Sequence, residues 1–134
     1  MSNHVHIIWQ PLFGFTPSII QASFMKHTSK QLKASLENTD KAALESCKVN
    51  KYERIYQLWK REPLSVELRT AAVFAQKLDY IHYNPVAAGL CAAPEAYYYS
   101  PARFYRDGID DLNMLVAAGR RPGGGVGDRE MFYI

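Results

Sequence analysis

The segment from Thr70 to Pro85 constrains the fold most, because it carries the clearest helix signals in the chain. Thr70 is a favourable N-cap residue, and Pro85 interrupts helical hydrogen bonding fifteen positions later. Between them, apolar side chains recur at helical spacing. This apolar stripe consists of Phe74, Leu78 and Ile81. We therefore expect a helix that packs this stripe inward and ends at Asn84, since a proline disfavours helical backbone angles in the residue before it.

A second stripe of the same helix carries polar groups that could do chemistry. Tyr80 and Asn84 are four residues apart, so a phenol and an amide lie one turn apart on one face. Near the start of the chain, residues 4–9 are β-branched and aromatic and predict a short strand, which would place His4 and His6 on the same side. Imidazoles and an amide can bind a divalent cation, and a phenol can act as a nucleophile.

Each of these residues also has an ordinary interpretation when taken alone. Two histidines at this spacing are more often surface residues than a metal site. Tyr80 could be an amphipathic core residue whose hydroxyl reaches solvent, and Asn84 could simply end a helix before proline. Only the combination of these residues, in this order, favours a shared site.

That ordered combination carries a family resemblance. His4-Val5-His6, then residues 80–90 (YIHYNPVAAGL), then residues 94–100 (PEAYYYS) resemble the single-tyrosine transposases with a His-hydrophobe-His motif. The REP-associated tyrosine transposases are the most similar group within that family, over roughly the first 110 residues. The resemblance implies an α+β domain over residues 1–115, with a ferredoxin-like antiparallel sheet and helices on one face. It also implies an N-terminally incomplete chain, because family members have a strand and a helix before the motif.

The resemblance further implies an activity and a set of site residues. His4, His6 and Asn84 would hold Mg²⁺ or Mn²⁺, and Tyr80 would attack single-stranded or hairpin-flanked DNA to form a 5′-phosphotyrosyl intermediate. A homodimer is expected as well. Lysines are the expected DNA contacts, although a solvated helix face explains the first three about as well. These lysines are Lys26, Lys30, Lys33 and Lys77.

Two other functions stay open from the residues. The first is a truncated or inactive relative that binds structured DNA without cutting it. The second is an unrelated metal hydrolase that uses His4 and His6, although no Asp or Glu base is visibly paired with them. DNA binding should depend on salt for the transposase and for its inactive relative, but only the transposase predicts a covalent adduct that is lost in Tyr80→Phe.

Composition is compatible with these predictions. The chain has 134 residues, of which 48% are hydrophobic, and its net charge of +3 permits a polyanionic partner without requiring one. Cys47 and Cys91 lack a Cys-x-x-Cys spacing, and the sequence shows no signal peptide and no apolar run long enough for a membrane span. We therefore expect a cytoplasmic, nucleoid-associated protein with reduced thiols.

The remaining segments give weaker predictions. Residues 17–37 should form a helix with Thr16 as its N-cap, and residues 38–54 a linker with a short helix. Residues 55–61 are rich in strand formers and are predicted to join the same sheet as residues 4–9. The glycine-rich residues 116–134 predict a flexible tail, and they lack the Gly-Lys-Ser/Thr ending of a phosphate-binding loop.

Overall fold

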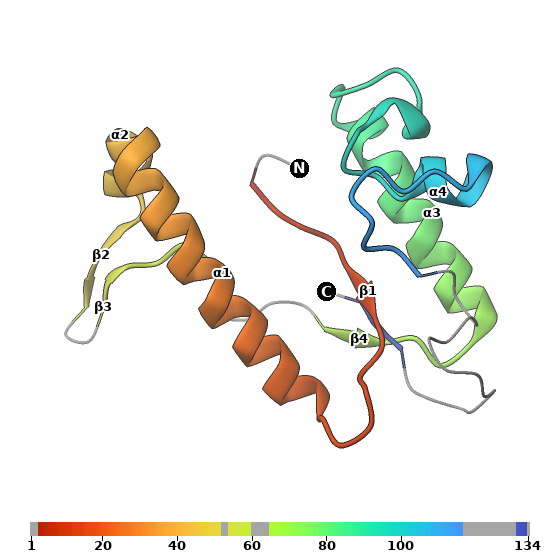
Figure 1. The fold of residues 1–134 in the computed structure, drawn as a ribbon, viewed down its shortest axis with the longest axis horizontal. Coiled ribbons are helices and arrows are strands. Elements are labelled where there is room, and N and C mark those ends of the chain that lie inside the picture. The colour runs from red at the N-terminus through yellow and green to blue at the C-terminus, as the bar shows by residue number, and fades with distance from the viewer. Residues whose placement is uncertain (1–2, 52–53, 60–64, 117–130, 134) are drawn as a thin grey trace. The chain divides into compact units, whose positions relative to one another are not determined.

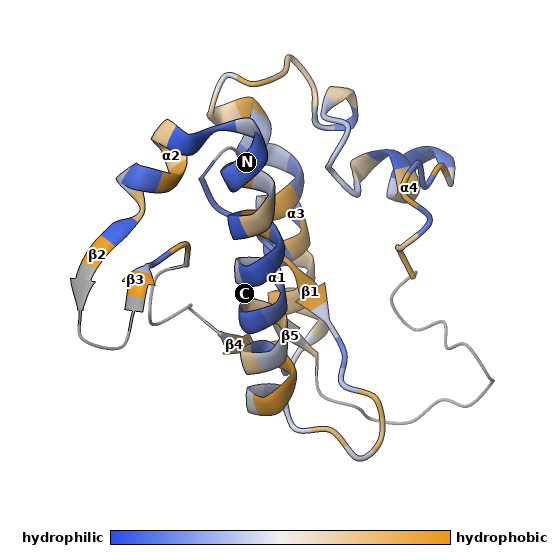
Figure 2. Cartoon of the chain, turned by 60° about the vertical axis from the view of Figure 1, so that its left-hand side comes forward, coloured by the Kyte–Doolittle hydropathy of each residue, from blue (hydrophilic) through white to orange (hydrophobic). Residues whose placement is uncertain are grey.

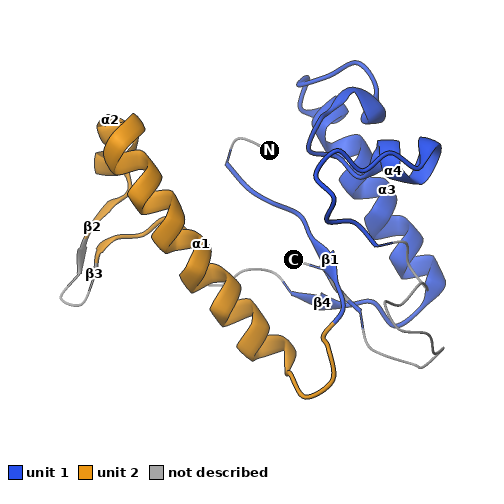
Figure 3. Cartoon of the chain, viewed as in Figure 1, with its two compact units in different colours: residues 1–10, 65–134 blue, residues 11–64 orange. Residues whose placement is uncertain are grey.

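The computed structural model describes residues 3–51, 54–59, 65–116 and 131–133. The chain forms two compact units, which are coloured separately in Figure 3. Unit 1 comprises residues 1–10 and 65–134, and unit 2 comprises residues 11–64. Helices and antiparallel strands occur in both units, so the predicted α+β class is confirmed (Figure 1). The single domain predicted over residues 1–115 includes all of unit 2 and most of unit 1.

Unit 2 is dominated by the helix α1, Pro17–Thr39, which agrees closely with the predicted helix. The Thr16 side chain accepts a hydrogen bond from the Ile19 amide, and Pro17 occupies the first turn, where a missing N–H costs nothing. Asp40 then ends α1 and begins α2, Lys41–Ser46. Its backbone N–H donates to the Leu36 carbonyl, and its carboxylate accepts from the Ala43 amide at 2.9 Å.

A two-stranded hairpin completes unit 2. Strands β2, Lys48–Lys51, and β3, Arg54–Tyr56, pair antiparallel with an irregularity in register. The prediction that residues 55–61 belong to the sheet of residues 4–9 is therefore wrong. Local pairing across a short connection closes a much smaller loop than pairing with the N-terminal strand would, so it costs less chain entropy. The predicted strand also ends early, and residues 60–61 lie outside the described part of the chain.

Unit 1 contains a three-stranded antiparallel sheet in the order β1-β5-β4. Its strands are β1, Ile8–Trp9, β4, Val66–Glu67, and β5, Phe132–Tyr133. The central strand is thus the last part of the chain, with Tyr133 opposite both Ile8 and Val66. The strand β5 falls within the predicted flexible tail of residues 116–134, where Tyr133 is a large aromatic residue whose burial offsets the cost of ordering. Residues 117–130 lie outside the described part.

The helix α3, Ala71–Ala87, lies in unit 1 and begins as predicted, with the Thr70 hydroxyl accepting from the Val73 amide. It does not end at Asn84, because Pro85 lies inside the helix. The proline lacks only its own N–H, and the next donors still bond back, Ala88 to the Asn84 carbonyl and Leu90 to the Pro85 carbonyl. Gly89, at φ +69°, then ends the helix in a left-handed conformation.

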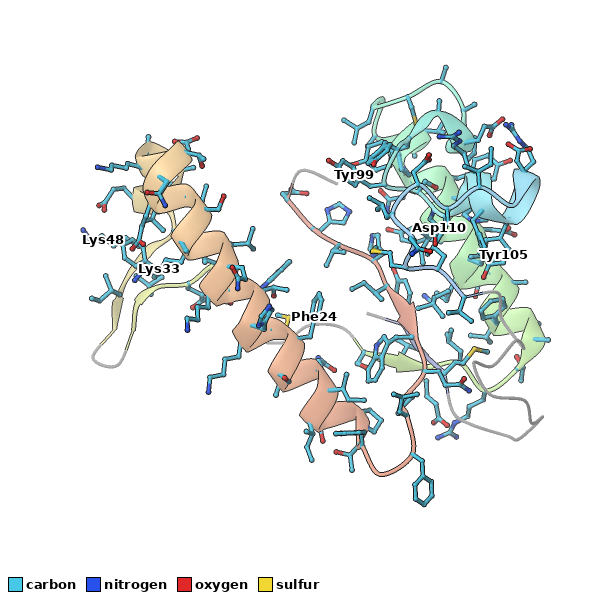
Figure 4. The ribbon with its side chains drawn as sticks, in the orientation of Figure 1. Phe24, Lys33, Lys48, Tyr99, Tyr105 and Asp110 are labelled. Atoms are coloured by element: carbon cyan, nitrogen blue, oxygen red, sulfur yellow. The ribbon has the colours of Figure 1, made fainter. Side chains whose placement is uncertain are left out.

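The segment after α3 packs back against it. The short 3₁₀ helix η1, Pro94–Ala96, contacts α3 and also α4, Ala102–Asp107. Tyr98 and Tyr99 meet edge to face with ring centroids 5.1 Å apart, and both are mostly exposed. Tyr99 is labelled in Figure 4. Within the described ranges, no helix has the length and apolar character needed to cross a membrane.

Buried apolar side chains are few in the described part of the chain. They are Leu44, Leu68, Ala102 and Tyr133, together with the ring of Pro85 inside α3. Leu68 and Tyr133 both belong to the β4–β5 region of unit 1, where the Leu68 amide also donates to the Met131 carbonyl at 2.7 Å. The residues coloured as hydrophobic in Figure 2 are therefore mostly half-buried or exposed. Unit 1 thus depends strongly on β5 for its core.

Candidate functional site

His6 is the centre of a polar cluster in unit 1. Its Nε2 lies 3.0 Å from the Asn84 amide nitrogen, and its Nδ1 lies 2.7 Å from the Tyr133 hydroxyl. The His6 ring is also edge-on to the Tyr80 ring, with centroids 5.2 Å apart. Three segments that are far apart in sequence therefore meet at one imidazole, namely the approach to β1, the helix α3 and the strand β5.

His4 joins this cluster from the same segment as His6. The two imidazole centroids are 4.8 Å apart, as expected for residues two apart on one side of an extended chain. The Nδ1 of His4 lies 2.6 Å from the Asn3 side-chain oxygen. The strand predicted over residues 4–9 is shorter in the structure, because only Ile8 and Trp9 join the ladder and residues 4–7 have no regular secondary structure. The two imidazole rings lie next to each other, and their role as metal ligands stays a prediction.

Tyr80 and Asn84 project from α3 one turn apart, as the sequence predicted. The continuation of α3 through Pro85 keeps Asn84 helical, and so keeps its amide beneath Tyr80 rather than turned away at a helix end. Tyr80 is 50% exposed, whereas Asn84 is half-buried against His6. The Tyr80 side chain is therefore largely open to solvent, whereas His6 and Asn84 are partly covered.

The donor set can be tested against a divalent cation. Two ligand atoms about 2.1 Å from one cation, at right angles, stand about 3.0 Å apart, which is the separation of the His6 Nε2 and the Asn84 amide atom. A half-turn of the amide would present its oxygen there. Within the described ranges no group of three His, Cys, Asp or Glu side chains is placed to hold a metal ion. A cation site made by His4, His6 and Asn84 would therefore need the amide as its third ligand, and metal binding by these residues stays a prediction.

Tyr133 is the member of the cluster that sequence reasoning missed. Only 4% of it is exposed, and its ring stacks on His6 with planes 13° apart. Burial raises the pKa of the Tyr133 phenol, and the nearby Tyr80 raises it further when that phenol is ionised. The sequence signal that could have found it is the apolar end of the chain, Met131–Tyr133, after the glycine-rich stretch.

Lys77 lies one turn before Tyr80 but has a partner within the protein. Its ammonium is 4.8 Å from the centre of the Tyr133 ring, in a cation–π arrangement. The site therefore has a positive charge beside the two tyrosines. The predicted phosphate contact of Lys77 stays a prediction.

The other predicted DNA contacts belong to unit 2. Lys26 and Lys30 are exposed on α1. Lys33 pairs with Glu37 at 3.4 Å and lies 5.5 Å from the centre of the Tyr56 ring. The Lys33 side chain is shown in Figure 4. These lysines belong to unit 2, whereas the His6 cluster belongs to unit 1, and DNA binding by the lysines stays a prediction.

His82 lies between Tyr80 and Asn84 in sequence but on another face of α3. Its ring packs against Tyr105, with centroids 5.6 Å apart. Burial lowers the pKa of His82, partly opposed by the charge of Asp79. His82 is therefore a packing residue on a different face of α3 from Tyr80 and Asn84.

No family model, no curated protein and no solved structure matches this chain. The class of protein is therefore argued from the cluster itself: an exposed phenol beside two imidazoles and an amide, carried by a small α+β unit.

Proposed function

We propose that the chain is a metal-dependent tyrosine transposase, or single-stranded DNA endonuclease, that cleaves single-stranded or hairpin-flanked DNA through a 5′-phosphotyrosine intermediate. Tyr80 is the nucleophile, and His4, His6 and Asn84 hold Mg²⁺ or Mn²⁺. In this proposal the sheet of unit 1 belongs to a ferredoxin-like arrangement, and the active form is a homodimer acting at the nucleoid.

One observation supports this proposal above the others. The Asn84 amide, 78 residues from His6 in sequence, lies 3.0 Å from its ring, and Tyr80 lies against the same ring. The family resemblance depends on two motifs, one around His6 and one from Tyr80 to Asn84, that are far apart in the sequence. If the resemblance were accidental, there would be no reason for these two segments to lie in contact.

The chemistry follows from the charges of these groups. A protonated phenol is a weak nucleophile, so a bound cation would supply the charge stabilisation at the phosphate. His4, His6 and Asn84 would be uncharged metal ligands, so they would not neutralise the positive charge of the cation. That charge would remain available to the phosphates of the DNA backbone. The Tyr80 oxygen would bond to phosphorus while the bond to the 3′ oxygen breaks. The phenol proton passes to solvent, and the leaving oxygen takes one up as a 3′-hydroxyl.

The test is a covalent capture assay with the full chain. Labelled single-stranded DNA flanking a hairpin is incubated with the protein and Mn²⁺, and the products are separated on a denaturing gel. We expect a protein-linked band in the wild type and in Tyr83→Phe, because Tyr83 is an exposed tyrosine on the same helix. Tyr80→Phe should abolish the band, since it removes only the attacking oxygen.

The alternatives predict other patterns on the same gel. DNA cleavage that survives Tyr80→Phe without an adduct would favour a metal hydrolase. Salt-dependent DNA binding by the wild type without any cleavage or adduct would contradict the enzymatic proposal and favour a structured-DNA-binding protein.

A further inference from the structure

The hydroxyl of Tyr133 is held against one atom of His6 from the opposite end of the chain. The two groups are 127 residues apart in sequence and 2.7 Å apart in space. The central position of β5 fixes this residue, since Tyr133 lies opposite Ile8 on one side and Val66 on the other. Stacking on His6, at 5.5 Å between centroids, restrains the ring as well. The hydroxyl thus occupies a position defined by the sheet.

The hydrogen bonds around His6 indicate which of its nitrogens carries the proton. The Asn84 amide nitrogen is a donor, so the His6 Nε2 that it contacts offers a lone pair. A neutral imidazole then carries its single proton on Nδ1, where the Tyr133 hydroxyl oxygen can accept it. A cation bound by His6 would need that same lone pair on Nε2. The present hydrogen bonds therefore match the protonation that metal binding requires.

We propose that Tyr133 is a positioning residue for His6, accepting the Nδ1 hydrogen so that the Nε2 lone pair faces Asn84 and the candidate cation. Metal-binding histidines commonly donate their second nitrogen in this way, which fixes both the tautomer and the ring orientation. The inference rests on the proposed function for the presence of the cation. The tautomer of His6 itself does not depend on it.

A role as the nucleophile is excluded for Tyr133 by its surroundings. It is 4% exposed, against 50% for Tyr80, so a DNA strand has no access to its oxygen in this arrangement. The Lys77 ammonium lies over the ring of Tyr133 and adds to its restraint. The two tyrosines beside His6 therefore have different roles, one exposed for reaction and one buried for positioning.

The test uses the full chain with Tyr133→Phe, which keeps the ring and removes the hydroxyl. Long-range ¹H–¹⁵N spectra at about pH 8, above the ordinary imidazole pKa, report which nitrogen of His6 is protonated. We expect the Nδ1–H form in the wild type and in the control Tyr83→Phe, and a shift toward the Nε2–H form in Tyr133→Phe. Mn²⁺ affinity, measured by electron paramagnetic resonance, should fall about tenfold or more in Tyr133→Phe.

The outcomes separate this inference from the proposed function. An Nε2–H form in the wild type would overturn the inference, and this measurement stands even where the variant fails to fold. So would a Tyr133→Phe protein with an unchanged tautomer and unchanged Mn²⁺ affinity. The wild type could also show the Nδ1–H form, lose it in Tyr133→Phe, and fail to bind Mn²⁺. That result would support the positioning of His6 and contradict the metal-dependent function.

Discussion

The contact between His6 and Asn84 makes a quantitative prediction about unit 1. We consider His6→Ala, Asn84→Ala and the double variant in a thermodynamic cycle. A neutral hydrogen bond of this kind contributes about 1 kcal/mol net, and the 3.0 Å separation lies within the normal range. The cycle also removes the gain in helix propensity that alanine brings at position 84, because that gain is the same in both backgrounds. The expected coupling energy without metal is therefore about 1 kcal/mol, stabilising.

The assay should report on unit 1 alone. The chain has two tryptophans, Trp9 in unit 1 and Trp59 in unit 2, so a Trp59→Phe background makes Trp9 the reporter during urea unfolding. A coupling energy within about 0.3 kcal/mol of zero would refute the contact, since that is the scatter of independent sites.

The same variants test the cation. Mn²⁺ at a hundred times its Kd should add about 2.7 kcal/mol to the wild type, whereas a hundredfold loss of affinity would leave about 0.4 kcal/mol at that concentration. We expect Asn84→Ala to show the smaller value. A Mn²⁺ stabilisation equal to that of the wild type would contradict the role of Asn84 as a ligand.

Three further predictions concern other parts of the chain. The pKa of Glu45 is lowered by its hydrogen bonds to Lys48 and then to Tyr56, so the stability that these contacts give unit 2 should be present above about pH 4.5 and be lost in more acidic solution. Glu45→Gln should reduce this loss of stability in acid, measured by unfolding that is followed through Trp59. An unchanged dependence of stability on pH would contradict the role of Glu45. Gly89→Ala should destabilise unit 1 by roughly 1 kcal/mol through its φ of +69° alone, because its added Cβ meets no atom within 4 Å. Trp9-monitored urea unfolding measures this loss, and unchanged stability would count against a left-handed end of α3. Removal of divalent cations with EDTA should abolish the adduct of Tyr80 on a denaturing gel, and Mn²⁺ should restore it; an adduct that persists in EDTA would exclude a metal requirement.

Two elements of the fold show where prediction from sequence succeeds. α1 and the start of α3 were predictable because Thr16 and Thr70 cap them and their apolar residues repeat at helical spacing, both of which are local signals. The end of α3 was not, because the penalty of Pro85 competes with the burial of its ring and with the hydrogen bonds that close the last turn. The end of α3 therefore depends on tertiary packing, which cannot be predicted from the sequence of one segment.

In the candidate site too, the features that depend on local spacing were predictable and those that depend on the fold were not. His4 with His6, and Tyr80 with Asn84, are pairs whose spacing places them together within one segment, so each half of the site was predictable. The contact between the His4–His6 pair and the Tyr80–Asn84 pair depends on the fold. This contact makes the prediction of a common site worth testing. Tyr133 had no such local partner. Its place beside His6 depends on an antiparallel pairing between the two ends of the chain, in a strand of which only Phe132 and Tyr133 form the ladder. A strand that short has no periodicity to detect, so only the apolar composition of Met131–Tyr133 marks this segment in the sequence, and the contact of Tyr133 with His6 has no local signal of its own.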